Sequence, residues 1–373
     1  MDRLNDDPRS VLHPGETVLE YLGAHEWSQS DLARRTDLTP KTISEICNGK
    51  APITPATALA FEKVLGRPAH LWLNLQRRYD EAQARIKESE RSASWREWAA
   101  RFPLKEMARR GWLEQGNAVG PNVSALLRFL GVSSPDSWER VWSAARVSYR
   151  QTRKFTTSVE AVSAWVRATE LAAADLSVSE FRRDEVQATI ERLRRLTREP
   201  VDKIMEPAQR LCASAGIALV FMPELSKTGI SGCVRWLGSK KVLVALSFRY
   251  KTDDQLWFTF FHEIGHVLLH LTEMTFVLDN PDDYVGDRTV DPEMQRVEDE
   301  ANRFAADTLV PPAKLAAFIK AKDYGNDAIH EFSEELGVGP GIVVGRLQHD
   351  GILAQHQGNS LKQRIAWTFG EDR

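Results

Sequence analysis

Two histidines and a glutamate lie inside an apolar stretch of this 373-residue chain, in the run His262-Glu263-Ile264-Gly265-His266. Aromatic and aliphatic residues flank the run on both sides: Trp257, Phe260, Phe261, Val267, Leu268 and Leu271. This pattern predicts a helix over residues 255–271 that is buried on most of its faces. Because burial of unsatisfied polar groups is costly, any fold of this chain has to supply partners for the three polar side chains.

The spacing of the two histidines favours a metal ion as that partner. Residues four apart share one face of a helix, so His262 and His266 can direct ring nitrogens at one ion. Glu263 lies beside them, where it can accept a proton from a water molecule that the ion activates. Two surface histidines placed by chance are the alternative, and the apolar surroundings argue against it. We therefore expect one Zn²⁺ per chain, with Glu263 as the catalytic base.

A hydrolytic zinc site also needs a third protein ligand. The next predicted helix, residues 293–309, offers two carboxylates, Glu298 and Glu300. Glu298 shares its face with small residues that would let the two helices approach closely, whereas Glu300 shares its face with bulkier and more charged ones. This difference favours Glu298 as the ligand, with Glu300 as the alternative. Asn302, one turn after Glu298, is expected to form a hydrogen bond behind the ligands.

Two other residues are expected near the metal without binding it. His270 is a rival third ligand, but at 3.6 residues per turn it lies about 80° away from the face of His262. We expect it to contact the substrate or to form a hydrogen bond. Arg235 belongs to a predicted strand at residues 230–237, which we interpret as an edge strand that an extended substrate could join by backbone pairing. Arg235 would then lie near the substrate.

Composition argues against disulfides and membrane spans. The three cysteines are odd in number and lie far apart, which favours a reducing compartment. No apolar run approaches the roughly 18–20 residues that span a bilayer, and the polar first ten residues do not resemble a signal peptide. The net charge of −3 gives no overall attraction to polyanions. We expect a cytoplasmic protein without membrane contact.

Helix caps and turns along the chain predict four segments and a mainly α (α+β) fold. Residues 1–85 are expected to form five short helices joined by tight turns. Residues 86–199 continue as a helical linker and middle domain. Residues 200–350 combine helices with strands at 217–222, 230–237 and 241–247, the last two joined by a turn at Gly238-Ser239. Residues 351–373 form a polar tail that we expect to be loosely ordered.

Further motifs accompany the histidine run. They are the extension Val267-Leu268-Leu269-His270, then Glu298-x-Glu300-Ala301-Asn302-x-Phe304-Ala305, and then Leu309-Val310-Pro311. Together they resemble the ImmA/IrrE metallopeptidase family. The resemblance implies a gluzincin-like fold in which a glutamate on the second helix completes the zinc site, and Glu298 and Asn302 match that pattern. It also implies cleavage of a partner protein, usually a helix-turn-helix repressor. A toxin or antitoxin encoded alongside and this chain itself are the other candidate substrates.

The N-terminal segment contains a second set of motifs: His13-Pro14-Gly15-Glu16, Ser28-Gln29-x-x-Leu32-Ala33, Ile43-Ser44-x-Ile46 and Asn48-Gly49-Lys50. These resemble the HigA-like antitoxins of the Xre helix-turn-helix class, which implies binding of double-stranded DNA through the third helix. The candidate contacts to bases are Gln29, Thr39, Lys41, Thr42 and Ser44, and the candidate contacts to phosphates are Arg34 and Lys50. The resemblance leaves open whether the chain forms a homodimer.

The charge of the N-terminal segment supports an alternative to DNA. Residues 1–90 contain 12 Lys and Arg against 14 Asp and Glu, an unusual balance for a strong DNA binder, so docking of a protein partner stays open. Together the two resemblances imply a transcription regulator fused to a zinc endopeptidase, with a role in toxin–antitoxin control or a stress response. The alternative is a DNA-binding antitoxin or repressor whose metallopeptidase fold is a non-catalytic platform for sensing or protein interaction.

Overall fold

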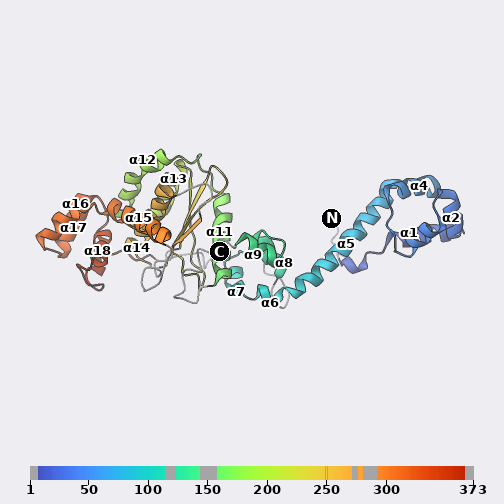
Figure 1. Cartoon of the computed structure of the whole chain (residues 1–373), viewed down its shortest axis with the longest axis horizontal. Coiled ribbons are helices and arrows are strands. Elements are labelled where there is room, and N and C mark those ends of the chain that lie inside the picture. The colour runs from blue at the N-terminus through green and yellow to red at the C-terminus, as the bar shows by residue number, and fades with distance from the viewer. Residues whose placement is uncertain are drawn as a thin grey trace. The chain divides into compact units, whose positions relative to one another are not determined.

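A computed structural model describes residues 7–113, 122–142, 158–247, 249, 251–270, 276–279 and 292–365. The chain divides into two compact units, Met1–Glu97 and Trp98–Arg373. Among the described residues, all strands belong to the second unit (Figure 1). The mainly α fold that the sequence predicts is confirmed. The predicted division into four segments stays a prediction.

The first unit is the expected bundle of five helices. After a short 3-10 turn at Pro8–Ser10, its helices are α1 (Pro14–Ala24), α2 (Gln29–Thr36), α3 (Pro40–Cys47), α4 (Pro55–Leu65) and α5 (Ala69–Ser94). Side chains at the predicted positions cap these helices: Ser28 forms a capping box with Asp31, and Thr39 accepts the backbone N–H of Thr42. Five fully buried residues fill the centre of the bundle: Val18, Leu32, Ile43, Phe61 and Trp72.

Two leucines of the bundle lie outside its core: Leu19 of α1 and Leu59 of α4 are 41% and 52% exposed. Each of these helices has 11 residues, about three turns, and buries only the face that packs on its neighbours. Both leucines lie beside that face.

The short helix α6 (Arg96–Ala99) contains the boundary between the two units. The second unit continues with α7 (Leu104–Arg109), α8 (Val123–Leu130), α9 (Pro135–Val141), α11 (Val159–Ala174), α12 (Arg183–Arg195) and α13 (Val201–Ser214). A mixed sheet comes next, built from β1 (Ile217–Phe221), β2 (Gly232–Trp236), β3 (Val242–Leu246) and β4 (Phe276–Asp279) in the order β1-β3-β2-β4. β1 is parallel to β3, and β2 is antiparallel to both β3 and β4.

The sheet order overturns one expectation from the sequence. β2 was expected to be an edge strand, but it lies between β3 and β4 and pairs with both. β4 was not predicted at all, because a strand of four residues gives no readable alternation. A substrate strand therefore cannot pair with β2 in this arrangement, and β1 and β4 are the outer strands of the part of the sheet that the structure describes.

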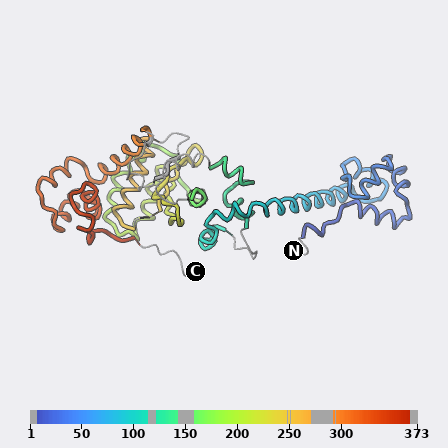
Figure 2. The backbone as a smooth tube through the Cα atoms, turned by 60° about the horizontal axis from the view of Figure 1, so that its bottom comes forward, coloured from blue at the N-terminus to red at the C-terminus, as the bar shows by residue number. Residues whose placement is uncertain are grey.

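Helices cover both faces of the sheet, as Figures 1 and 2 show for the second unit. On one face, Val234 of β2 and Val244 of β3 pack with α13 and with α14 (Asp253–Leu269). The side chains next to them in sequence point to the other face, which packs against α11. There Arg235 of β2 forms an ion pair with Glu170 of α11. Because side chains alternate along a strand, the even-numbered residues of β2 point towards α14.

The C-terminal part packs around α14. It comprises α15 (Pro292–Leu309), α16 (Pro312–Ala321), α17 (Asn326–Leu336), α18 (Pro340–His349) and a 3-10 turn at Asn359–Leu361. The loose order expected of the tail is wrong for residues 351–365. Leu353 and Ile365 are buried in the main core, and Thr252 forms a β-bridge with Arg364. The polar composition of the tail hid these few apolar anchors.

None of the described helices combines the length and apolar character needed to cross a bilayer. Residues 280–291, which join the two helices predicted at 255–271 and 293–309, lie outside the described residues.

Candidate metal centre

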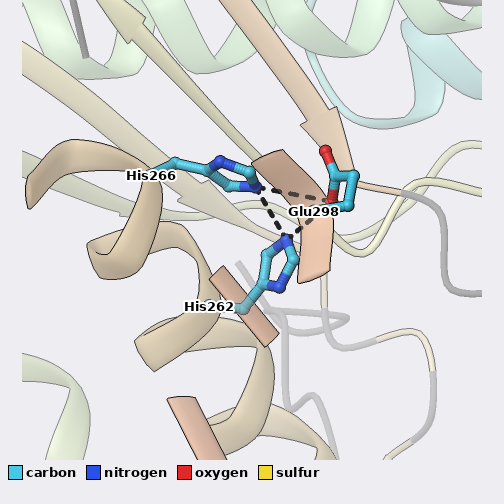
Figure 3. Close-up of side chains that lie close together, drawn as sticks. All are labelled: His262, His266 and Glu298. Carbon is cyan, nitrogen blue, oxygen red and sulfur yellow. Dashed lines mark hydrogen bonds and ion pairs between the residues drawn. The ribbon is translucent and has the colours of Figure 1, made fainter. Parts of the chain in front are cut away.

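Two histidines of α14 and a glutamate of α15 converge on one point (Figure 3). The Nε2 atoms of His262 and His266 are 2.9 Å apart, and Oε2 of Glu298 lies 3.2 Å from the first and 3.5 Å from the second. Zinc bonds to such atoms measure about 2.0–2.2 Å, so tetrahedral ligands lie about 3.3 Å from one another. The three donor atoms therefore have the spacing of a ligand set, and no other such group of His, Cys, Asp and Glu occurs among the described residues.

Close packing of α14 and α15 brings the three side chains together. Gly265 faces Ala301 so tightly that an added Cβ would lie 3.2 Å from the Cα atom of Ala301. Ala301 and Ala305 are fully buried between the helices. Small side chains on both helices let the backbones approach, as the sequence pattern around Glu298 predicts. Glu300, on a neighbouring face of α15, does not reach the cluster.

A hydrogen bond behind the cluster orients His262. Its Nδ1 lies 2.9 Å from Oδ1 of Asn302. An amide oxygen only accepts hydrogen bonds, so Nδ1 carries the proton and Nε2 presents a lone pair to the cluster. Asn302 lies one turn after Glu298, as expected from the sequence.

A second series of hydrogen-bonded side chains lies behind His266. Its Nδ1 lies 3.3 Å from Nδ1 of His270, and Nε2 of His270 lies 2.9 Å from Oε2 of Glu300. If Nε2 of His270 donates to Glu300, its Nδ1 accepts the proton of His266 Nδ1, and Nε2 of His266 faces the cluster as a lone pair. His270 and Glu300 therefore lie behind the ligands, not among them.

The electrostatics of the cluster suit a cation. Burial lowers the pKa of His266 and so favours the neutral ring, which is the form that binds metal. Burial alone would raise the pKa of the Glu298 carboxyl, but hydrogen bonds with His262 and His266 outweigh this effect and bring the pKa well below its ordinary value. Neutral imidazole and ionised carboxylate are the protonation states that a zinc ligand set requires.

Glu263 is fully buried beside the cluster, against the start of β2. An added Cβ at Gly232 would lie 2.1 Å from Oε1 of Glu263, so only glycine leaves room for this carboxylate. The sequence reasoning missed the role of Gly232. The only signal was a glycine at the start of a predicted strand, which often marks a close approach.

The structure does not bring Arg235 to the cluster. This residue lies on the face of the sheet that meets α11, where it is ion-paired with Glu170 and half-buried. Its neighbours Gly232 and Val234 face α14 instead. Successive side chains of a strand point to opposite faces of the sheet, so Arg235 points away from the metal ligands. The expected contact of Arg235 with substrate does not fit this geometry.

The candidate DNA contacts lie in the first unit, on and around α2 and α3. Arg34, Thr39, Lys41 and Lys50 are exposed, whereas Gln29, Thr42 and Ser44 are partly buried. Several of these side chains already have partners within the unit: Arg34 pairs with Asp31, Lys41 lies 3.8 Å from Glu45, and the hydroxyls of Thr39 and Thr42 lie 2.8 Å apart.

Comparison with known proteins matches each of the two compact units to a different family. Residues 18–72 match the helix-turn-helix family and residues 233–348 match the IrrE N-terminal-like domain, a peptidase M78 family. The uncharacterized HTH-type transcriptional regulator YddM of Escherichia coli is 35% identical over 71 residues, which are 19% of this chain and 76% of YddM. The virulence-associated protein I of Dichelobacter nodosus is 39% identical over 71 residues, 19% of this chain and 66% of the relative.

Solved structures also match part of the chain. A HigA-family addiction module antidote protein from Coxiella burnetii is 34% identical, with 22% of this chain and 92% of the antidote covered and a TM-score of 0.22. The Pseudomonas aeruginosa antitoxin HigA, solved with the higBA promoter, is 27% identical, with 22% of this chain and 89% of that one covered and a TM-score of 0.21.

Proposed function

This chain belongs to the helix-turn-helix regulators and carries an M78 peptidase domain of the IrrE type, and on that premise we propose that it is a zinc-dependent endopeptidase that cleaves a regulatory protein. The observation that carries the proposal is the convergence of His262, His266 and Glu298 next to the buried carboxylate of Glu263. A metal-binding platform without chemistry would have no need for a base beside the ligands.

The donor set fits zinc. Two imidazole nitrogens and one carboxylate oxygen are the protein ligands of hydrolytic zinc sites, and three protein ligands leave one position open. When bound, zinc acts as a Lewis acid that makes water a nucleophile near neutral pH. His262, His266 and Glu298 would hold the ion, at one Zn²⁺ per chain.

The other residues of the centre have distinct proposed roles. Glu263 accepts a proton from the attacking water and passes it to the leaving amine. Asn302 keeps His262 in the tautomer that presents Nε2. His270 and Glu300 keep His266 in the tautomer that presents its Nε2 to the metal. We also propose that His270 contacts the substrate. The apolar surroundings of α14 exclude bulk water from the reaction.

The first unit is proposed to bind double-stranded DNA, with α3 in the major groove. Gln29, Thr39, Lys41, Thr42 and Ser44 would contact bases. Arg34 and Lys50 would contact phosphates. The match of residues 18–72 to the helix-turn-helix family supports the proposal.

The proposed substrate is a protein that acts in the same regulation. One chain carries both a DNA-binding domain and a peptidase domain, so its substrate is expected among repressors, toxins or antitoxins that share the promoter or the operon. The proposed compartment is the cytoplasm, where such proteins occur.

Metal analysis and a cleavage assay with the protein encoded by the neighbouring gene test the enzyme proposal. We expect about one zinc per purified wild-type chain, and loss of zinc in His262→Ala. The matched control His349→Ala removes an exposed histidine of α18 and should keep the metal. Glu263→Gln should keep zinc and lose cleavage, because the amide cannot accept the proton.

The outcomes separate the enzyme from the platform. Wild-type protein that is purified without zinc would contradict the assignment of His262, His266 and Glu298 as metal ligands. If zinc is present and Glu263→Gln changes neither fragment pattern nor cellular phenotype, the peptidase fold serves as a platform and the enzyme proposal fails.

A further inference from the structure

Two charged side chains stand on the outer face of α3, the helix that is proposed to enter the major groove. Lys41 and Glu45 are the charged residues of α3 and lie one turn apart, about 40° from each other around the helix axis. The buried residues of α3, Ile43, Ile46 and Cys47, lie on the opposite side. The side chains of Lys41 and Glu45 are 84% and 42% exposed. These two side chains therefore point away from the core of the first unit.

The hydroxyl groups of α3 that are candidates for base contacts already belong to its helix caps. The Oγ1 atoms of Thr39 and Thr42 lie 2.8 Å apart, and Oγ1 of Thr39 also accepts the backbone N–H of Thr42. At the other end, Nδ2 of Asn48 donates to the carbonyl of Ser44 at 2.8 Å and lies 3.2 Å from Oγ of Ser44. Base edges would have to compete with these caps for the three hydroxyl groups.

The contact between Lys41 and Glu45 is easier to replace. Nζ of Lys41 lies 3.8 Å from Oε1 of Glu45, which is longer than a hydrogen bond. Exposed ion pairs one turn apart on a helix contribute little to stability. Both side chains can therefore turn from each other to a base edge at small cost.

The chemistry of the Glu45 carboxylate selects one base. A carboxylate only accepts hydrogen bonds, and in the major groove the amino group at N4 of cytosine is the donor that fits it. Adenine also offers an amino group, but the N7 lone pair beside it repels a carboxylate. The ammonium group of Lys41 donates to O6 or N7 of guanine. Four residues of helix rise about 6 Å, roughly two base-pair steps, so the two side chains can reach the same or neighbouring base pairs.

We propose that Glu45 is a specificity-determining residue of the first unit, which reads cytosine through its N4 amino group while Lys41 reads a guanine of the same or a neighbouring base pair. The inference rests on the proposed binding of DNA through α3 and adds Glu45 to the candidate base contacts. The carboxylate is repelled by the phosphates of any duplex, so it also disfavours DNA that lacks the cytosine.

Selection from a random duplex library tests this assignment. The full chain is incubated with duplex DNA of random sequence at about 0.15 M salt, and the bound fraction is sequenced. We expect one position at which wild-type protein prefers cytosine about tenfold over each other base. Glu45→Gln should change this preference to adenine, because the glutamine amide pairs with N6 and N7 of adenine. This variant should also bind unrelated duplex DNA more tightly, since one negative charge is removed.

Glu81→Gln is the matched control. It removes a carboxylate from another exposed pair of the same unit, since Glu81 lies 2.7 Å from Arg85 one turn further on α5. The base preferences should then stay as in the wild type. If Glu45→Gln selects the same bases as the wild type, Glu45 is only a surface residue of α3 and the inference is overturned. If wild-type protein enriches no sequence at all, the proposed DNA binding fails as well.

Discussion

At the scale of single residues, the position of the Glu263 carboxylate depends on the absence of a side chain at Gly232. Gly232 has no side chain, and a Cβ there would lie 2.1 Å from Oε1 and 2.8 Å from Cδ of Glu263. The carboxylate is the far end of a flexible chain, so it can move away from an added methyl group. Such a movement would take the proposed base out of reach of its proton while the histidines and Glu298 stay in place.

We therefore predict that Gly232→Ala keeps zinc and loses at least ~100-fold in cleavage rate, the usual contribution of a positioned base. The measurement pairs metal content with single-turnover cleavage. Gly23→Ala on α1, where an added Cβ meets nothing within 4 Å, is the control and should cleave at the wild-type rate. A Gly232→Ala protein with normal cleavage would show that Glu263 tolerates displacement and would contradict its role as the base.

At the scale of secondary-structure elements, the distance between α14 and α15 sets the geometry of the metal centre. Ala301 is fully buried against Gly265, and Glu298 lies one turn before it on α15. We predict that Ala301→Leu costs about 1–3 kcal/mol of unfolding free energy through overpacking. It should also weaken zinc binding, because the helix that carries Glu298 is pushed away from the two histidines.

Chelator competition and urea unfolding measure the two effects of Ala301→Leu. Arg303→Leu, on the exposed side of the same helix, should change neither quantity by much. Unaltered zinc affinity in Ala301→Leu would mean that the spacing of the helices does not control the ligand set.

The N-terminus of α14 is held by the C-terminal segment through buried charges. Lys362 lies 2.7 Å from Asp254, and the backbone N–H of Gln363 donates to Asp253 at 2.9 Å. Burial raises the pKa of Asp253 to about 6 from an ordinary value of 3.8, against the opposing effect of the hydrogen bond from Gln363. The folded protein thus keeps a proton that the unfolded chain releases between about pH 4 and pH 6. Stability therefore falls as the pH rises through this range, by about 3 kcal/mol at most.

We predict that Asp253→Asn stabilises the second unit at pH 7.5 and much less at pH 4.5. The amide oxygen can still accept the N–H of Gln363, while the cost of a buried charge is removed. Urea unfolding with EDTA at both pH values measures the difference without a contribution from metal. Asp202→Asn, an exposed acid in the first turn of α13, is the control and should show little change at either pH. A stabilisation that does not depend on pH would contradict the assigned cause.

Elements with strong local signals could be predicted from the sequence, and contacts between distant segments could not. Thr39, Ser28 and Gly66 mark helix ends through their own side chains or backbone, so the five-helix bundle follows from local rules. The choice of Glu298 over Glu300 also depended on a local pattern, the small residues on one face of a helix. By contrast, β4 next to β2 and Lys362 next to Asp254 arise only when chain segments far apart in sequence meet. The burial of Arg235 against α11 has the same origin.

At the scale of the whole molecule, the two proposed functions belong to different compact units. The candidate DNA contacts lie in Met1–Glu97, and the metal ligands and Glu263 lie in Trp98–Arg373. Each unit has a hydrophobic core of its own. A ligand that binds the folded form of one unit stabilises that unit, by about 4 kcal/mol when its concentration is 1,000 times the dissociation constant.

Zinc should therefore act on one of two unfolding transitions. We predict two transitions for the full chain in a calorimetric scan, and EDTA should lower the midpoint of one by several degrees while the other stays fixed. Short duplex DNA that binds the first unit should raise the midpoint of the EDTA-insensitive transition. In His262→Ala the EDTA response should vanish, which separates loss of bound zinc from a general effect of the chelator. A single transition that moves as a whole would show instead that the units unfold together and that metal in one stabilises the DNA-binding domain in the other.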